Sequence, residues 1–295
     1  MKVVKPVTFI DAMLISSTAT ETYAAYNAAT TYALGNKVTS GSVVYECIQA
    51  PNLNHPVTDE LWWKVSGPTN RWAMFDREIS TQTVQDGVLT VVLKPGYVNS
   101  LAVFGLEGTT LVVTVRNGLA GPVVYSKTIS LDGTIITSLY EYFYEPAVQR
   151  SEVVLMDLPT YGDAHITITI TGPQAACALC SVGPFYYLGD VERGATFGLL
   201  SFSTKTTSAS GVTALKKGKN SSRIGCRFVL DTAHINKVNH ILKNLDGIAC
   251  AWVGVENDTG RYTPFIIWGF IRDFSVEVAY PTISYCSIDL EALAQ

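Results

Sequence analysis

The sequence contains few charged residues. Asp, Glu, Lys and Arg make up 16% of its 295 residues, against about 25% in an average soluble domain. Its mean hydropathy is positive, at +0.22. Two interpretations account for this: neighbouring chains cover much of the surface, or the protein is β-rich with Thr and Ser as its polar residues. The net charge of −4 excludes a global basic field for nucleic acid.

Long apolar runs are also missing. No stretch of about 18 apolar residues occurs, so we expect no membrane span. Pro6 and Asp11 interrupt the apolar residues near the N-terminus, and this pattern predicts no signal peptide. We therefore expect synthesis in a reducing cytoplasm.

Cysteines are few and their spacing is not that of a small disulfide scaffold. Cys177 and Cys180 have a CxxC spacing. Neither a second pair nor a nearby histidine cluster completes a zinc site around them. Their apolar surroundings predict buried thiols in a strand.

Catalytic motifs are absent from the sequence. No Gly-x-Ser-x-Gly, Walker loop or dinucleotide fingerprint occurs. The four histidines are scattered, and His234 and His240 are six residues apart, which does not give a metal pair on one helix face. A glycosidase needs two carboxylates about 5–10 Å apart, and four acidic residues are candidates for such a pair: Asp157, Asp163, Glu192 and Asp273. We predict no enzyme, no catalytic residues, no cofactor and no metal.

The pattern of strands and turns predicts a mainly β, multidomain protein. Residues 1–23 are predicted to be an N-terminal segment that docks on the third domain of this chain or on a neighbour. Residues 24–69 form a small β module, and 70–189 form a β-sandwich resembling a jelly roll, because short β-branched runs alternate with turns. Residues 190–295 form an α+β domain.

Several finer predictions apply to the two larger domains. The alternation of Thr and Ile at 166–170 predicts a half-buried strand. A helix is predicted from Asp231-Thr232 to Asp246-Gly247, on a small sheet that buries Trp252 and Trp268. Residues 204–220, with the basic run 216–219, are predicted to be a solvated loop. The aromatic segment 139–146 is predicted to be a lid over the sandwich end, with a contact patch as the alternative.

The small module is rich in aromatic residues. Its pattern is Tyr32-x-x-Gly35-x-x-Val38-x-x-Gly41-x-x-Val44-Tyr45-x-Cys47, followed by Trp62, Trp63 and Gly67. The residues around Gly41 predict a β-hairpin. Adjacent Trp62 and Trp63 point to opposite sides of an extended chain. We expect Trp63 in the core and Trp62 at the surface, and we expect Trp72 to pack at the junction with the sandwich.

This pattern resembles the small carbohydrate-binding module of bacterial chitinases, a β fold in which exposed aromatic rings stack on sugars. The resemblance covers roughly residues 24–67. It implies a glycan-binding site drawn from four aromatic residues: Trp62, Trp63, Tyr45 and Tyr32. That family opens with Trp-Trp or Ala-Trp where this chain has Ala25-Tyr26-Asn27.

The junction at 70–76, Ser80-Thr81-Gln82-Thr83 and the segments 267–274 and 285–291 together resemble structural proteins of tailed-bacteriophage tails. That resemblance implies a virion component of the tail tip or baseplate, present in symmetric multiple copies. Its partners would be other tail subunits, with a host-surface glycan as a further ligand. The alternatives are a host-glycan adsorption protein and a carbohydrate-active enzyme.

Overall fold

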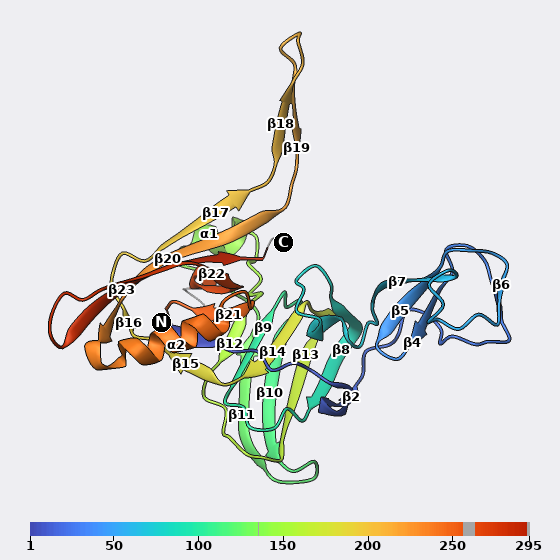
Figure 1. Cartoon of the computed structure of the whole chain (residues 1–295), viewed down its shortest axis with the longest axis horizontal. Helices are drawn as coiled ribbons and strands as arrows, with labels where there is room; N and C mark the ends of the chain where they lie inside the picture. The colour runs from blue at the N-terminus through green and yellow to red at the C-terminus, as the bar shows by residue number, and fades with distance from the viewer. Residues whose placement is uncertain (135, 256–262, 294–295) are drawn as a thin grey trace.

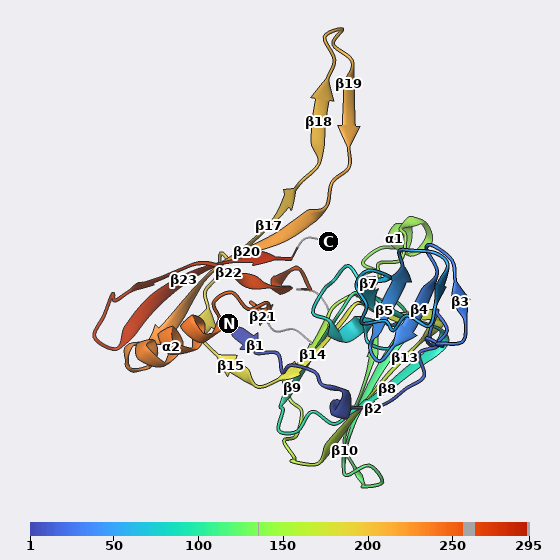
Figure 2. The same cartoon turned by 45° about the vertical axis from the view of Figure 1, so that its right-hand side comes forward.

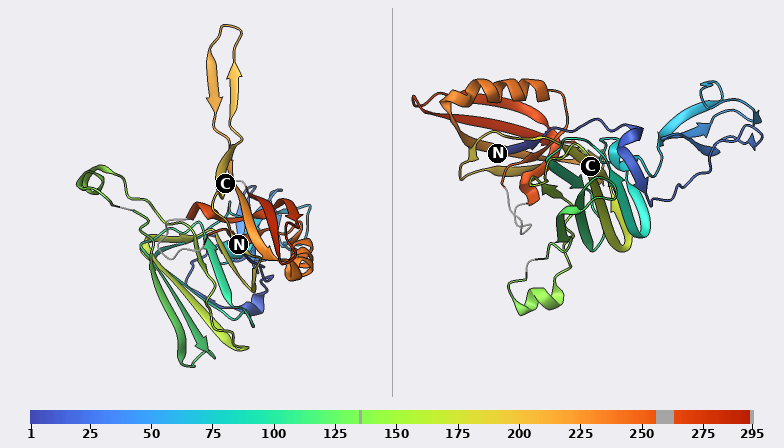
Figure 3. Two further views of the ribbon diagram at one scale, coloured as in Figure 1. Left: turned by 90° about the vertical axis from the view of Figure 1, so that its left-hand side faces the viewer. Right: turned by 90° about the horizontal axis from the view of Figure 1, so that it is seen from below.

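The computed structural model describes residues 1–134, 136–255 and 263–293. The body of the protein is a stack of a five-stranded sheet, a three-stranded sheet, an eight-stranded sheet and one helix (Figure 1). A small module, a long hairpin and a loop with a short helix project from it (Figures 1 and 3). The prediction of a mainly β fold with several sheets is confirmed.

The five- and three-stranded sheets form the predicted β-sandwich. Their strand orders are β11-β10-β13-β8-β2 and β12-β9-β14, and the pairings are antiparallel. The strands are β2 (Leu14–Ser17), β8 (Thr83–Leu93), β9 (Ser100–Phe104), β10 (Thr110–Asn117), β11 (Val123–Ser130), β12 (Val153–Leu155), β13 (Ala164–Cys177) and β14 (Leu179–Gly183).

Strand β13 lies between β10 and β8 and confirms the half-buried strand predicted from the Thr-Ile alternation. Ile166, Ile168 and Ile170 are all buried in the sandwich core. Thr167 and Thr169 lie on the opposite face, because successive side chains of a strand alternate between faces. Thr169 is in hydrogen-bond contact with Thr90 of β8, with 3.4 Å between the hydroxyl oxygens.

The three-stranded sheet is buried on both faces. Leu101 and Val103 of β9 pack into the sandwich core. Ala102 and Phe104, which alternate with them, pack instead against the eight-stranded sheet. Trp268 belongs to that second cluster, and its ring centroid lies 6.2 Å from that of Phe104. The sandwich and the C-terminal domain are therefore joined by a shared apolar layer.

The eight-stranded sheet has the order β15-β1-β21-β22-β23-β20-β16, and β17 also pairs with β20. Its strands are β1 (Lys2–Val4), β15 (Phe185–Tyr187), β16 (Asp190–Val191), β17 (Thr196–Ser201), β20 (Asn220–Asp231), β21 (Cys250–Val253), β22 (Ile266–Glu277) and β23 (Ile283–Ala292). Short 3-10 helices are η1 (Asp11–Met13), η2 (Ala73–Phe75), η3 (Thr232–His234) and η4 (Thr263–Phe265).

The first strand of the chain is built into this C-terminal sheet. β1 lies between β15 and β21. Val3 packs in the apolar core of the C-terminal domain, and Val4 packs in the apolar cluster that this domain shares with the three-stranded sheet. Through β1 the segment docks on the third domain of its own chain, the first of the two predicted alternatives, whereas its second strand, β2, pairs with β8 of the sandwich. Because β15 also belongs to this sheet, the C-terminal domain begins before the predicted residue 190.

Helix α2 (Ile235–Leu245) covers the outer face of the eight-stranded sheet. Val238, Leu242 and Leu245 are buried against the sheet. The Asp231 carboxylate accepts a hydrogen bond from the backbone N–H of Ala233, 2.9 Å away, and so caps the 3-10 turn that leads into the helix. The predicted helix is confirmed, as is the burial of the two C-terminal tryptophans, Trp252 and Trp268.

The predictions for two segments, 204–220 and 139–146, are wrong. Residues 204–220 do not form an irregular loop: β18 (Thr204–Thr207) and β19 (Thr213–Lys216) pair as a hairpin that extends far from the body (Figures 1 and 2). Residues 139–144 do not form a lid. They form a capped helix, α1 (Leu139–Tyr144), at the end of a projecting loop with no residue buried (Figure 3).

All six cysteines are free and buried. Cys177 ends β13 and Cys180 lies in β14, which confirms buried thiols in strands for the CxxC pair. Burial raises the pKa of the Cys177 thiol to about 12 and keeps that of Cys180 well above its usual value. No described helix has the length and apolar character needed to cross a membrane.

Candidate glycan-binding face of the small module

The small module is built from two antiparallel sheets. One has the order β4-β5-β7 and the other pairs β3 with β6. The strands are β3 (Thr31–Tyr32), β4 (Lys37–Ser40), β5 (Val43–Cys47), β6 (Asn52–Leu53) and β7 (Trp63–Pro68). Gly41 occupies the turn between β4 and β5 with φ +60°, which confirms the predicted hairpin, because glycine adopts such angles without steric cost.

The core of the module contains two of the four predicted sugar-binding residues. Trp63 is 2% exposed and Tyr32 is 8% exposed. Their ring centroids lie 5.1 Å apart in an edge-to-face contact, and Trp63 Nε1 donates a hydrogen bond to the His55 carbonyl at 2.9 Å. The sequence places Trp63 in the core correctly. The prediction that Trp63 or Tyr32 binds a sugar through a ring face is wrong, because both side chains are buried in the module core.

Trp62 is half-buried and lies beside the core. Its ring stacks on the imidazole of His55, with centroids 3.9 Å apart and planes 11° from parallel. His55 Nδ1 in turn lies 3.8 Å from an Asp59 carboxylate oxygen. A flat, partly exposed ring held by a neighbour on one face can meet the C–H groups of a sugar with its other face.

Tyr45 is also half-buried. It pairs with Val38 on β4 and with Val65 on β7, and it packs against the module core. Of the four predicted residues, Trp62 and Tyr45 therefore keep exposed surface. His55, which holds Trp62, is a residue that the sequence pattern did not single out as part of a site.

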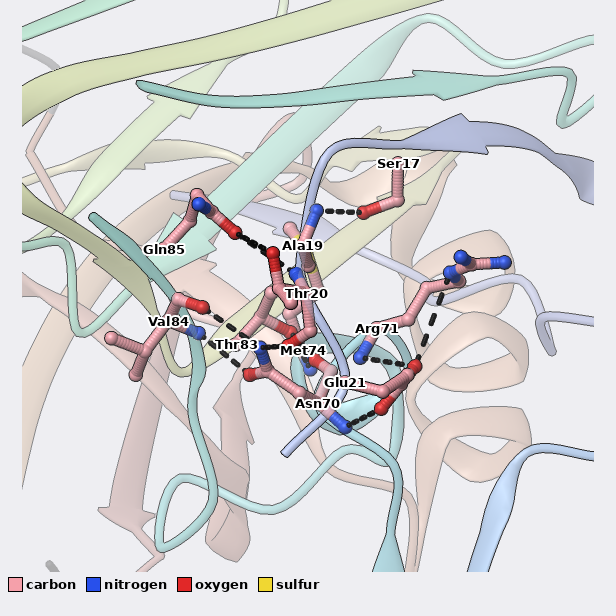
Figure 4. Close-up of polar contacts among 10 residues, drawn as sticks. All are labelled: Ser17, Ala19, Thr20, Glu21, Asn70, Arg71, Met74, Thr83, Val84 and Gln85. Atoms are coloured by element: carbon pink, nitrogen blue, oxygen red, sulfur yellow. Dashed lines mark hydrogen bonds and ion pairs between the residues drawn. The ribbon is translucent and has the colours of Figure 1, made fainter. Parts of the chain in front are cut away.

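Asn70 holds the two chain ends of the module together (Figure 4). Its amide nitrogen donates to the carbonyls of Thr20 at 2.7 Å and Val84 at 2.8 Å, and its amide oxygen accepts from the Val84 N–H at 2.9 Å. Its backbone N–H donates to the Glu21 carboxylate at 2.9 Å. The entry and exit of the module are therefore fixed to strand β8.

A groove of about 570 Å³ runs between the module and the sandwich. Val43, Val65 and Pro68 line its module side, and Trp72 and Phe75 line the other. The rings of the last two are in edge-to-face contact, so Trp72 packs at the junction as predicted. Two carboxylates, Asp76 and Glu78, also line it, and burial raises the pKa of Asp76.

The four carboxylates considered for glycoside hydrolysis each interact with a separate partner. Asp157 accepts a hydrogen bond from the Tyr125 hydroxyl and Asp163 pairs with Lys94. In the C-terminal domain, Glu192 pairs with Arg227, whereas Asp273 accepts from the Phe274 N–H. Within the described ranges, no three His, Cys, Asp or Glu residues are grouped so that they could hold a metal ion.

No protein-family model matches the chain, and no curated protein matches it.

Proposed function

We propose that this chain is a structural subunit of a bacteriophage tail, in the tail-tip or baseplate region, that assembles with other tail proteins in several symmetric copies. The observation that supports this most strongly is the presence of large apolar side chains on projecting elements. Five residues of α1 with large apolar or aromatic side chains are 64–80% exposed: Leu139, Tyr140, Tyr142, Phe143 and Tyr144.

Exposed aromatic residues gathered on one element mark a contact surface. Tyrosine in particular is enriched at the centre of protein interfaces. The low charge of the whole chain, 16%, agrees with this, because charged residues are depleted from interface cores. The sequence resemblance to tail proteins supplies the kind of assembly.

The body of the protein suits a scaffold. The shared cluster between the two larger domains and the insertion of β1 into the C-terminal sheet leave no flexible linker between them. The small module, the β18–β19 hairpin and the α1 loop therefore project from a single packed body (Figure 2).

The proposal is tested by quantifying this chain in purified particles of the virus that encodes it. We expect the chain in intact particles, in a fixed ratio to the other tail proteins that corresponds to several copies per tail. A chain that is made in infected cells but is missing from washed particles would contradict the proposal.

The partial exposure of Trp62 favours a second function, binding of a host-surface glycan. His55 stacks on this ring and fixes its orientation. Pull-down of the protein by host cell-wall polysaccharide tests this function. Glycan binding would be independent of assembly, since the module projects at a distance from α1 and from the hairpin (Figure 1).

A further inference from the structure

The hairpin and the α1 loop differ in charge as well as in position. We define the arm as residues 202–219, which include β18 and β19, and the knob as residues 132–149, which include α1. The arm contains four lysines and no acidic residue: Lys205, Lys216, Lys217 and Lys219. The knob contains three acidic residues and no basic one: Asp132, Glu141 and Glu145.

Within the described part of the chain, the two strands of the arm are not packed against an apolar core. The residues of β18 and β19 are exposed, and Leu215 and Val212 are 75% and 68% exposed. An isolated two-stranded hairpin is marginally stable in water. Among the described residues, no ion pair joins the arm lysines to a carboxylate.

The path of the arm is nevertheless well defined by its backbone. The Phe202 N–H donates to the Lys219 carbonyl at 3.0 Å. A Cβ on Gly218 would lie 2.2 Å from the Phe202 carbonyl oxygen, so the close approach of the two chains here needs glycine. The tip closes through a hydrogen bond from the Ser208 N–H to the Val212 carbonyl at 2.8 Å.

Helix α1 of the knob is held by local contacts, whereas at the base of the knob the Gln149 side-chain amide donates to the Gly108 carbonyl at 2.8 Å. The Ser138 hydroxyl oxygen accepts from the Glu141 N–H at 3.2 Å, and the Glu141 carboxylate accepts from the Ser138 N–H at 3.1 Å. This capping box forms the helix without burying any residue. At the base of the knob, the Gly133 N–H donates to the Val148 carbonyl at 2.8 Å.

We propose that the basic arm of one copy of this chain binds the acidic aromatic knob of a second copy. The lysines would face the carboxylates, with Leu215 and Val212 against the tyrosines and Phe143. Within one chain, the arm and the knob project in different directions (Figure 3), and no described hydrogen bond or ion pair joins them. The partner of each is therefore sought on another copy.

An arm-to-knob contact uses two different surfaces, so each copy has one of each to offer. Such a contact repeats from copy to copy and closes into a ring or continues as a filament. This inference deepens the proposed tail function, on which it rests, by naming the partner of both projections.

The test compares the solution mass of four proteins by sedimentation. They are the unmodified chain, an arm variant (Lys216→Glu with Lys217→Glu), a knob variant (Tyr142→Ser with Phe143→Ser) and a control (Tyr97→Ser). Tyr97 is 78% exposed on the sandwich, outside both projections. Circular dichroism checks that each is folded, which is expected because the substituted side chains are exposed.

We expect the unmodified chain and the control to associate, and the association to weaken as salt is added. The arm and knob variants should each associate about thirtyfold more weakly, the loss typical of a hot-spot truncation. A mixture of these two variants should form a dimer and nothing larger, because it offers one intact arm and one intact knob.

Three results would overturn the inference. One is an unmodified chain that stays monomeric at the highest attainable concentration and low salt. Another is a mixture of the two variants that forms no dimer. The third is an arm that binds a DNA duplex while the protein does not self-associate. If instead the chain is a component of particles but fails this test, the tail function stands and the arm-to-knob contact does not.

Discussion

The indole of Trp62 lies almost parallel to the imidazole of His55, with ring centroids 3.9 Å apart. The next residue, Trp63, points the other way into the module core. Two neighbouring residues of the same type thus have opposite roles, one in the surface and one in the core.

Substitution of each tryptophan by alanine should therefore have different effects. Trp63→Ala should destabilise the module by about 3–5 kcal/mol, because it empties the centre of a small core. Trp62→Ala should leave the module folded and abolish any binding of cell-wall polysaccharide. Thermal unfolding and polysaccharide pull-down measure the two effects. Leu61→Ala, at an adjacent and 75% exposed position, is the matched control, and loss of binding in it as well would count against a role specific to Trp62.

Asn70→Ala should loosen the attachment of the module. It removes the side-chain hydrogen bonds to Thr20 and Val84, and leaving such partners unsatisfied costs about 1–3 kcal/mol. Hydrogen exchange at residues 18–24 and 66–72 should rise, while exchange in β10 and β13 stays unchanged. Unaltered exchange at the module ends would show that Asn70 does not hold them.

The cysteines should be unreactive in the folded protein. Burial raises the thiol pKa to about 12 for Cys177 and Cys250 and to about 11 for Cys226. A thiol-specific reagent at pH 8 should therefore label none of the six cysteines until denaturant is added, and then all of them. A Thr207→Cys variant, with its new thiol on the exposed arm, supplies the positive control. Fast labelling of the unmodified chain would contradict the described core.

Glu152 should lower the stability of the protein at neutral pH. Burial raises its pKa in the folded state above the ordinary value of 4.5. The folded state then favours the protonated acid, so the penalty is absent below the unfolded pKa and appears as the pH rises through the folded one. Glu152→Gln should raise the Tm at pH 7 and leave it unchanged near pH 4. The exposed Glu60→Gln provides the comparison, and an equal effect of Glu152→Gln at both pH values would disprove the assignment.

The sequence predicts those elements whose side chains divide into a buried and an exposed set. The alternating isoleucines of β13 and the periodic apolar residues of α2 are of this kind, and both were found where expected. The burial of Trp63 follows from the same reasoning.

The arm escapes such prediction because neither of its faces is buried. Its strands consist mainly of Thr and Lys, with no apolar alternation to distinguish them from a loop. The knob is wrongly predicted to be a lid for the opposite reason. Aromatic residues usually pack on a core, but a local capping box at Ser138 and Glu141 holds these in solvent.

The role of Asn70 depends on contacts between distant parts of the chain. Its partners Thr20 and Val84 are 50 and 14 residues away in sequence, and no local pattern shows that they meet. His55 is similar, because its stacking on Trp62 needs the loop between β6 and β7 to fold back.

Oxidative footprinting of Tyr142, Phe143 and Leu215, in the free protein and in purified tails, tests most directly whether these projecting apolar surfaces are covered by neighbours. We predict strong oxidation of all three in the free protein and clear protection in the tails. Equal oxidation in both states would contradict the account.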